Sequence, residues 1–304
     1  MKLLFIGHSG PRNLGGIART AQLVKQNLEL LGWEVEFGRC RRPPRGPYKA
    51  DVVWVYGETD KIPEILRAAS CPVIINMPLT HTKQRFERSV ALFDSWKHPR
   101  LYMGTFTHGT AARHSRLLAL PKQIRSPAPG LPFAQRKNIF LGDLAKNRRP
   151  ALVGGFDVDK FCALARARVP QAELVFVEQY TGHRVAAPKH ARVIPYTDTL
   201  MEALATYRTM CSLVAGETFA MIPAEAQACG TPVIYRHMPQ SLTEYFGHSA
   251  VCARDEQDMA DWLGMIYNDE AEWTAWSGAG INNARAYNGA QALSSILKKV
   301  ALHG

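Results

Sequence analysis

Short apolar runs rich in β-branched and aromatic residues alternate with amphipathic helical segments along the whole chain. The first helical segment shows this pattern clearly, because apolar residues from Ile17 to Leu31 recur at helical spacing and Gly32 follows as a stop. Alternation of this kind favours parallel sheets with helices on both faces. The chain is therefore predicted to be an α/β protein, with strands at 2–7, 33–37, 51–56, 72–76, 100–106, 138–141, 151–154, 173–178, 192–194, 210–214 and 232–235.

A proline-rich stretch divides the alternation into two similar halves. Residues 121–132 carry four prolines, after which the strand-helix pattern starts again. We place a domain boundary near residue 135, which gives two Rossmann-like domains at 1–135 and 136–304, with the option that the last helix crosses back to the first. The tail 270–302 is predicted to be helical, with breaks near 278–280 and 288–289. Ligands of such sheets bind at the carboxyl ends of the strands, so a site is expected where the two edges meet.

Positive charge is concentrated in the first half. Residues 1–137 hold 22 of the 37 lysines and arginines but 9 of the 26 acidic residues, so their net charge is +13 and that of the remainder is −2. A domain this basic predicts a polyanionic partner. The six cysteines form no C-x-x-C pair, and no apolar run approaches the roughly 20 residues of a membrane span. We expect free thiols in a cytoplasmic protein, or one of the host cytoplasm if it is phage-encoded.

One segment, AGETFAMIPAEAQACGTPV at 215–233, carries the clearest chemistry. Pro223 suits the first turn of a helix, so we expect a helix to begin near Ile222. Backbone N–H groups at the start of a helix bind phosphate groups. The candidate diphosphate ligands are the backbone groups of Phe219, Ala220 and Met221.

Two glutamates bracket this helix start. Glu225 falls on the first turn, where a carboxylate can accept hydrogen bonds from a ribose diol, and Glu217 precedes the turn, within reach of a sugar ring. Glu217-x7-Glu225 with the run EAQACGTPV resembles the E-x7-E and E-A-x-A-x-G-T-P-V signature of retaining GT-B glycosyltransferases, a family that includes glycogen synthase-like and sucrose-synthase-like enzymes. The resemblance implies two Rossmann-like domains facing across a cleft. It also implies metal-independent transfer from a nucleotide diphosphate sugar, a UDP-sugar being favoured, with Glu217 catalytic and Glu225 binding the donor.

The resemblance extends more weakly along the rest of the chain. Gly15-Gly16 is similar to the family's glycine-rich first loop, which approaches the donor phosphates. The family places an Arg and a Lys five residues apart at the start of the second domain, where they neutralise the leaving diphosphate. Here Asp143 takes the Arg position, which leaves Lys146 or Arg148 as the diphosphate ligand, unless both belong to a solvated basic loop.

A histidine is the second catalytic candidate. The family often offers a His at the end of its fourth strand, where this chain has Asn76, and His81 follows close behind. His81 either folds back toward the cleft or lies on the surface. Asp157-Val158-Asp159 stands at a predicted helix start and is interpreted as capping, so no metal is predicted.

The resemblance implies that the acceptor binds to the basic first domain. The candidate acceptor ligands are Arg41, Arg42, Arg45, Lys83 and Arg85. Basic residues interleave with Phe86, Phe93 and Trp96, which favours a hydroxymethylated base in DNA as acceptor. These aromatic residues recur on one side of a predicted helix, so they also fit a helix that lies on an anionic membrane, in an enzyme with a lipid-linked or cell-envelope glycan acceptor. A third interpretation is that they form an ordinary core face. The alternative of another class is a DNA-binding protein with a glycosyltransferase-like shell and no catalysis.

Overall fold

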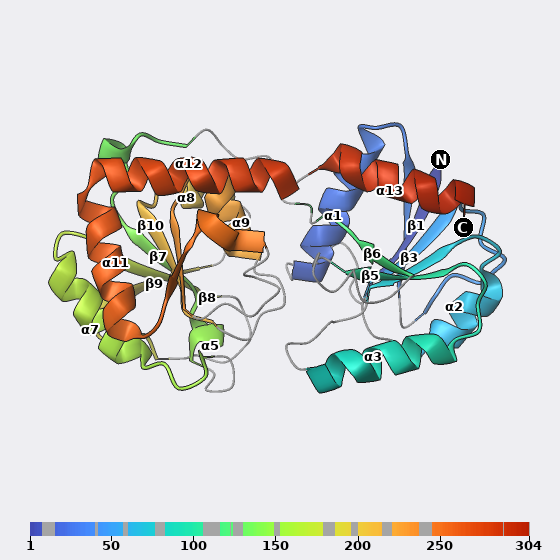
Figure 1. Ribbon diagram of the computed structural model, residues 1–304, viewed down its shortest axis with the longest axis horizontal. Helices are drawn as coiled ribbons and strands as arrows, with labels where there is room; N and C mark the ends of the chain where they lie inside the picture. The colour runs from blue at the N-terminus through green and yellow to red at the C-terminus, as the bar shows by residue number, and fades with distance from the viewer. Residues whose placement is uncertain are drawn as a thin grey trace. The chain divides into compact units, whose positions relative to one another are not determined.

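The chain forms two compact units in a computed structural model (Figure 1). One unit comprises Met1–Ile124 with Tyr287–Gly304, and the other comprises Arg125–Ala286. The structure describes residues 1–7, 16–39, 42–56, 60–76, 83–105, 116–121, 123, 130–148, 153–178, 186–195, 200–214, 221–236, 245–287 and 289–303.

A six-stranded parallel sheet forms the centre of the first unit. Its strand order is β2-β1-β3-β4-β5-β6. The strands are β1 (Lys2–Gly7), β2 (Glu34–Arg39), β3 (Val52–Tyr56), β4 (Val73–Asn76), β5 (Leu101–Thr105) and β6 (Leu117–Ala119). The five strands predicted for this half are confirmed to within two residues, whereas β6 has three residues, too few for a periodic pattern to reveal.

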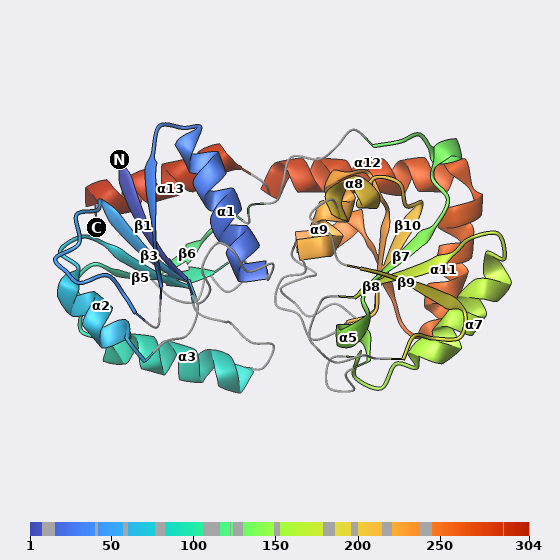
Figure 2. The same ribbon diagram turned by 180° about the vertical axis from the view of Figure 1, so that it is seen from behind.

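Helices cover both faces of this sheet, as the two opposite views show (Figures 1 and 2). They are α1 (Gly16–Glu29) and α13 (Ala290–His303) on one face and α2 (Ile62–Ala68) and α3 (Lys83–Ser95) on the other. Neighbouring strand residues point to opposite faces, so Trp54 packs with α1 and α13 while Val55 packs with α2 and α3. The indole nitrogen of Trp33 donates to Ser294 Oγ at 2.8 Å, which holds the last helix against the first unit.

The apolar stripe of α3 belongs to the core. Phe93 has no exposed surface, and Val90 and Trp96 pack against the same cluster. Phe93 is therefore not available to stack on bases or to enter a membrane, and the half-buried Val90 and Trp96 support the core-face interpretation. The side chain of Phe86 lies outside the described residues. None of the helices in the described ranges has the length and apolar character needed to cross a bilayer.

The second unit also contains a six-stranded parallel sheet, in the order β12-β11-β10-β7-β8-β9. Its strands are β7 (Ile139–Asp143), β8 (Leu174–Glu178), β9 (Ala191–Pro195), β10 (Thr209–Ser212), β11 (Val233–Arg236) and β12 (Val251–Ala253). The strand predicted at 151–154 is wrong where the structure describes it. Val153 is helical, and Gly154 and Gly155 have φ angles of +49° and +82°, which turn the chain into the next helix. The three-residue β12 was not predicted.

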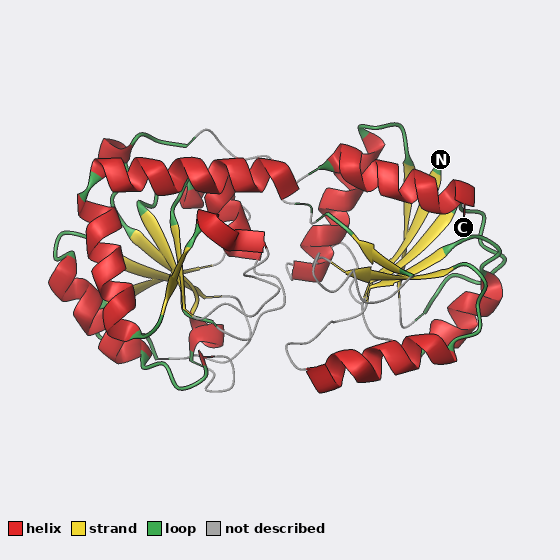
Figure 3. Ribbon diagram, in the orientation of Figure 1, coloured by secondary structure: helices red, strands yellow, loops and turns green. Residues whose placement is uncertain are grey.

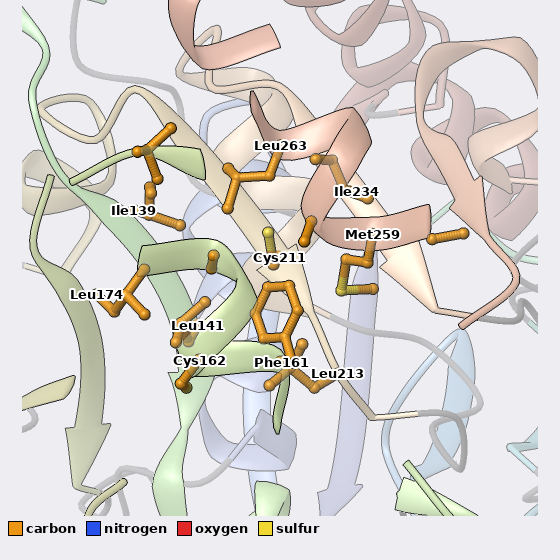
Figure 4. Packing of buried hydrophobic residues seen from close by; sticks show 14 of the residues in the cluster. Ile139, Leu141, Phe161, Cys162, Leu174, Cys211, Leu213, Ile234, Met259 and Leu263 are labelled. Atoms are coloured by element: carbon orange, nitrogen blue, oxygen red, sulfur yellow. The ribbon is translucent and has the colours of Figure 1, made fainter. Parts of the chain in front are cut away.

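Two long helices, α7 (Val158–Arg168) and α11 (Glu256–Asn268), pack on one face of the second sheet (Figure 4). Other helical elements among the described residues include α5 (Leu144–Asn147), α8 (Leu200–Leu204), α9 (Met221–Ala228), α12 (Glu270–Tyr287) and the 3-10 turns Phe133–Gln135 and Gly247–Ser249 (Figure 3). The predicted break near 278–280 is wrong, because α12 runs through it. A Cβ atom on Gly280 would lie 3.2 Å from Gln227 Cγ, so this glycine permits close packing of α12 on α9.

The proline-rich stretch ends in the second unit, so the predicted boundary at 135 lies inside that unit. Arg136 has almost no exposed surface and donates to the carbonyl oxygens of Leu131 and Cys229, both at 2.7 Å. It also donates to Thr231 Oγ1 at 2.7 Å and to the carbonyl oxygen of Tyr207 at 3.2 Å. These bonds fasten residues 131–136 to the body of the second unit.

Candidate functional site

Two neighbouring strands of the second sheet, β7 and β10, lead into the turns that contain the predicted donor ligands. The turn after β7 opens α5, and the segment after β10 leads to α9. Helix α9 begins at Met221, one residue before the predicted start at Ile222, with Pro223 in its first turn. The turn after β7 and the described residues 213–214 after β10 lie at the carboxyl edge of the sheet, where α/β proteins bind ligands.

Glu225 lies on α9 and has no exposed surface. Residues 223–228 of this helix are all buried, so the carboxylate is held inside the unit rather than in solvent. Glu225 is the fifth of the eight residues of α9 and so lies one residue beyond the first turn, where the sequence analysis placed it. A buried carboxylate is costly without charge or hydrogen-bond compensation.

Buried hydrogen bonds at its far end fix α9 in place. Arg136 donates to the carbonyl oxygen of Cys229, which directly follows the helix. Gln227 Nε2 donates to the carbonyl oxygen of Ser249 at 2.7 Å, and its Oε1 accepts from Asn283 at 3.1 Å. The chain then leaves through Gly230, whose φ of +71° favours glycine. The EAQACGTPV run thus builds a rigid helix and its exit into β11.

An acidic residue organises the turn after β7. Asp143 Oδ1 accepts from the backbone N–H of Lys146 at 3.1 Å and so caps α5, while Asn147 Nδ2 donates to the carbonyl oxygens of Leu141 and Asp143. Gly142 precedes it with a φ of +83°. Asp143 is buried, and the side chain of Lys146 is half-buried. A capping carboxylate therefore stands where the resemblance places an arginine.

Arg148 is bound within the protein. It makes a two-pronged ion pair with Asp159, and its Nε donates to the carbonyl oxygen of Ala186 at 3.2 Å. The hydrogen bonds from Arg148 lower the pKa of Asp159.

Asp157 caps α7 by accepting from the backbone N–H of Lys160 at 3.0 Å, which confirms the capping interpretation of this segment.

The other predicted site residues fall into two groups. Gly16 opens α1, Arg42 and Arg45 are exposed, and Lys83 and Arg85 lie in the first turn of α3. The remaining ones lie outside the described residues: Gly15, Arg41, His81, Glu217, Phe219 and Ala220. Across the described ranges, no three His, Cys, Asp or Glu side chains gather as a metal site would require.

Arg236 was missed by the sequence prediction. It ends β11 at the same carboxyl edge, and the signal in the sequence was a basic residue directly after the apolar run 232–235. Arginines are mostly exposed in proteins, so an arginine at the end of an inner strand is a candidate for binding an anion.

Solved structures resemble this fold. HepE of Anabaena, in complex with UDP and glucose, matches over 99% of this chain and 100% of its own, with a TM-score of 0.64 and 11% identity. Sucrose-phosphate synthase of Thermosynechococcus elongatus matches over 98% of both chains, with a TM-score of 0.62 and 13% identity. A TarM variant of S. aureus, in complex with fondaparinux, α-GlcNAc-glycerol and UDP, matches over 82% of this chain and 55% of its own, with a TM-score of 0.64 and 9% identity.

The chain spans about half the length of TarM, since it covers 55% of that protein. At such low identities the matches establish the fold, which is the two-unit GT-B fold. No protein-family model matches the chain, and no curated protein matches it.

Proposed function

We propose that the protein is a retaining, metal-independent glycosyltransferase that moves a sugar from a UDP-sugar to a hydroxyl group of a polyanionic acceptor. The observation that carries this proposal is the buried carboxylate of Glu225 on α9, the helix that follows β10 in a GT-B fold. Such a carboxylate can accept hydrogen bonds from a ribose diol while the helix start receives the diphosphate. The UDP bound to HepE and to TarM supports a uridine nucleotide as donor.

The chemistry asks the protein to orient two substrates and to stabilise the departing diphosphate. The backbone N–H groups of Phe219, Ala220 and Met221 and the cation of Lys146 are proposed to carry that negative charge. Gly15 and Gly16 are proposed to approach the same phosphates. Glu217 is proposed to hold the reacting sugar, with His81 as the second catalytic residue.

The acceptor is proposed to be polyanionic, with a hydroxymethylated base in DNA favoured. The net charge of +13 over residues 1–137 and the exposed Arg42 and Arg45 support this choice. The apolar residues of α3 give no support to DNA as the acceptor, because Phe93 lies in the core and Val90 and Trp96 pack against the same cluster. TarM has been captured with the glycan fondaparinux, so transfer to a cell-envelope glycan is the competing outcome.

Mass spectrometry after incubation with UDP-sugars tests the proposal. The acceptors are hydroxymethylated DNA, unmodified DNA and an anionic lipid and glycan extract. We expect UDP release with mass gain on hydroxymethylated DNA, and loss of both in Glu217→Gln. Mass gain on the extract alone would identify the envelope acceptor instead. DNA binding without any nucleotide binding would identify a non-catalytic shell.

A further inference from the structure

Of the two terminal nitrogens of Arg236, Nη2 donates a hydrogen bond within the protein, whereas Nη1 has no acceptor among the described residues. Nη2 donates to the carbonyl oxygen of Gly154 at 2.8 Å, and the guanidinium carbon lies 4.8 Å from the centre of the Phe156 ring. Nη1 is buried, and no residue in the described ranges accepts a hydrogen bond from it. Because a guanidinium is a rigid planar fork, the contacts on Nη2 also fix the direction of Nη1.

The surroundings of Arg236 remove part of the water around its side chain. Burial lowers the pKa of Arg236, and the carboxylate of Glu256 opposes that shift. Glu256 does not itself bind Arg236: it accepts from the backbone N–H of Asp157 at 2.9 Å and from Lys160 Nζ at 3.3 Å. A buried charged donor of this kind gains most from an anionic acceptor.

Charge at this edge of the sheet singles out Arg236. Among the last residues of the six strands, as the structure describes them, Asp143 and Glu178 are acidic and Arg236 alone is basic. The neighbouring Arg148 already binds Asp159. Of the two basic residues Lys146 and Arg148 in the turn after β7, Arg148 is thus held by an ion pair, and Lys146 is the one proposed for the diphosphate.

We infer that Arg236 binds a phosphate oxygen of the nucleotide diphosphate through Nη1. This inference rests on the proposed function, since it assumes a nucleotide at this edge. It adds a cation on β11 to the helix start of α9 and to Lys146. The bond would be charge-assisted, and its donor is already oriented by Gly154 and Phe156.

Calorimetric titration with UDP and with uridine tests it, because the two probes differ only in the phosphates. The variants are Arg236→Met, Arg236→Lys and the matched control Arg192→Met, an exposed arginine on β9. We expect Arg236→Met to weaken UDP binding by about 10- to 100-fold, as a bond worth about 1.5–3 kcal/mol implies, and to leave uridine binding unchanged. Arg236→Lys should fall between, because an ammonium cannot bind Gly154 and a phosphate as a planar fork does.

The outcomes separate this inference from the proposal beneath it. Wild-type UDP affinity retained in Arg236→Met overturns the inference alone. Equal losses for UDP and uridine also overturn it, because the contact would then not be with phosphate. Absence of UDP binding in the wild-type protein overturns the proposed function and this inference together. If Arg236→Met fails to fold, the comparison of UDP with uridine in Arg236→Lys decides.

Discussion

Arg148 binds both carboxylate oxygens of Asp159, with Nη1 2.5 Å from Oδ2 and Nη2 3.0 Å from Oδ1. This ion pair joins the end of the α5 turn to the first turn of α7. The third nitrogen of the same guanidinium, Nε, donates to the carbonyl oxygen of Ala186 at 3.2 Å. Although Arg148 was predicted as a diphosphate ligand, these contacts favour a role in holding the turn, and Lys146 stays the proposed ligand.

Asp159→Asn tests that distinction. We expect the free energy of unfolding to fall by about 0.2–1 kcal/mol at pH 7, because Asp159 is more than half exposed and solvent screens the pair. The pKa of Asp159 is below its ordinary 3.8 in the folded protein, so its contribution is present at neutral pH and is lost as the pH falls through the folded pKa. Urea unfolding at pH 7 and at pH 3 measures this. Tighter UDP binding by Asp159→Asn would show instead that Arg148 is a competing diphosphate ligand.

Glu225→Gln replaces the buried carboxyl group of α9 with an amide and keeps the size of the side chain. We expect UDP-sugar binding to weaken by about tenfold or more, because hydrogen bonds to a charged acceptor contribute about 1.5–3 kcal/mol. Glu225→Ala should weaken it further. Glu202→Gln, on the exposed side of α8, is the matched control and should bind normally. Unchanged affinity in both Glu225 variants, by calorimetry, would remove the donor-site assignment.

Phe93 and its neighbour Leu92 lie on different faces of α3, one toward the core and the other toward solvent. Phe93 is fully buried, whereas the exposed fraction of Leu92 is 51%. Phe93→Ala should lower the free energy of unfolding by about 3–5 kcal/mol, and Leu92→Ala should stay within about 0.5 kcal/mol of the wild type. Denaturant unfolding gives both values. A loss of binding to anionic vesicles in Leu92→Ala, with stability intact, would restore a membrane role for this helix.

Arg136→Lys should destabilise the second unit by roughly 1–3 kcal/mol for each acceptor left unpaired, because one ammonium cannot reach all four oxygens. Burial lowers the pKa of Arg136 to about 10, so the cost of burying its charge is constant below that pH and is relieved only as the pH rises through it. The deficit should therefore not change between pH 6 and pH 8. Arg192→Lys, which is exposed, is the control for urea unfolding. Equal stability of both variants would contradict the structural role of Arg136.

The pattern of apolar residues was enough to predict most of the strands, because parallel strands that are buried on both faces appear as continuous apolar runs. They failed where a local signal was ambiguous. The apolar run 151–154 contains a glycine that turns the chain, while Gly280 marks close helix packing rather than a helix end. The prolines predicted a boundary near residue 135, whereas the buried hydrogen bonds of Arg136 attach residues 131–136 to the second unit. Arg236 became a candidate through the burial of one nitrogen atom, which no sequence pattern encodes.

The cysteines give a test of the core that does not depend on function. Cys252 is exposed, while Cys71, Cys162, Cys211 and Cys229 are buried. Burial raises the pKa of Cys162 to about 12 and raises that of Cys211 as well, so both thiols stay protonated at pH 8 and react only on unfolding.

In a Cys40→Ser background, which removes the thiol that lies outside the described residues, thiol titration at pH 8 should show one fast group. Cys252→Ser should abolish that fast phase and leave the slow one at the rate of unfolding. A fast phase that survives Cys252→Ser would mean that one of the four buried thiols is open to solvent. Because Cys162 and Cys211 lie in the cluster under α7 and α11, their protection reports directly on the packing that supports the carboxyl edge of the second sheet.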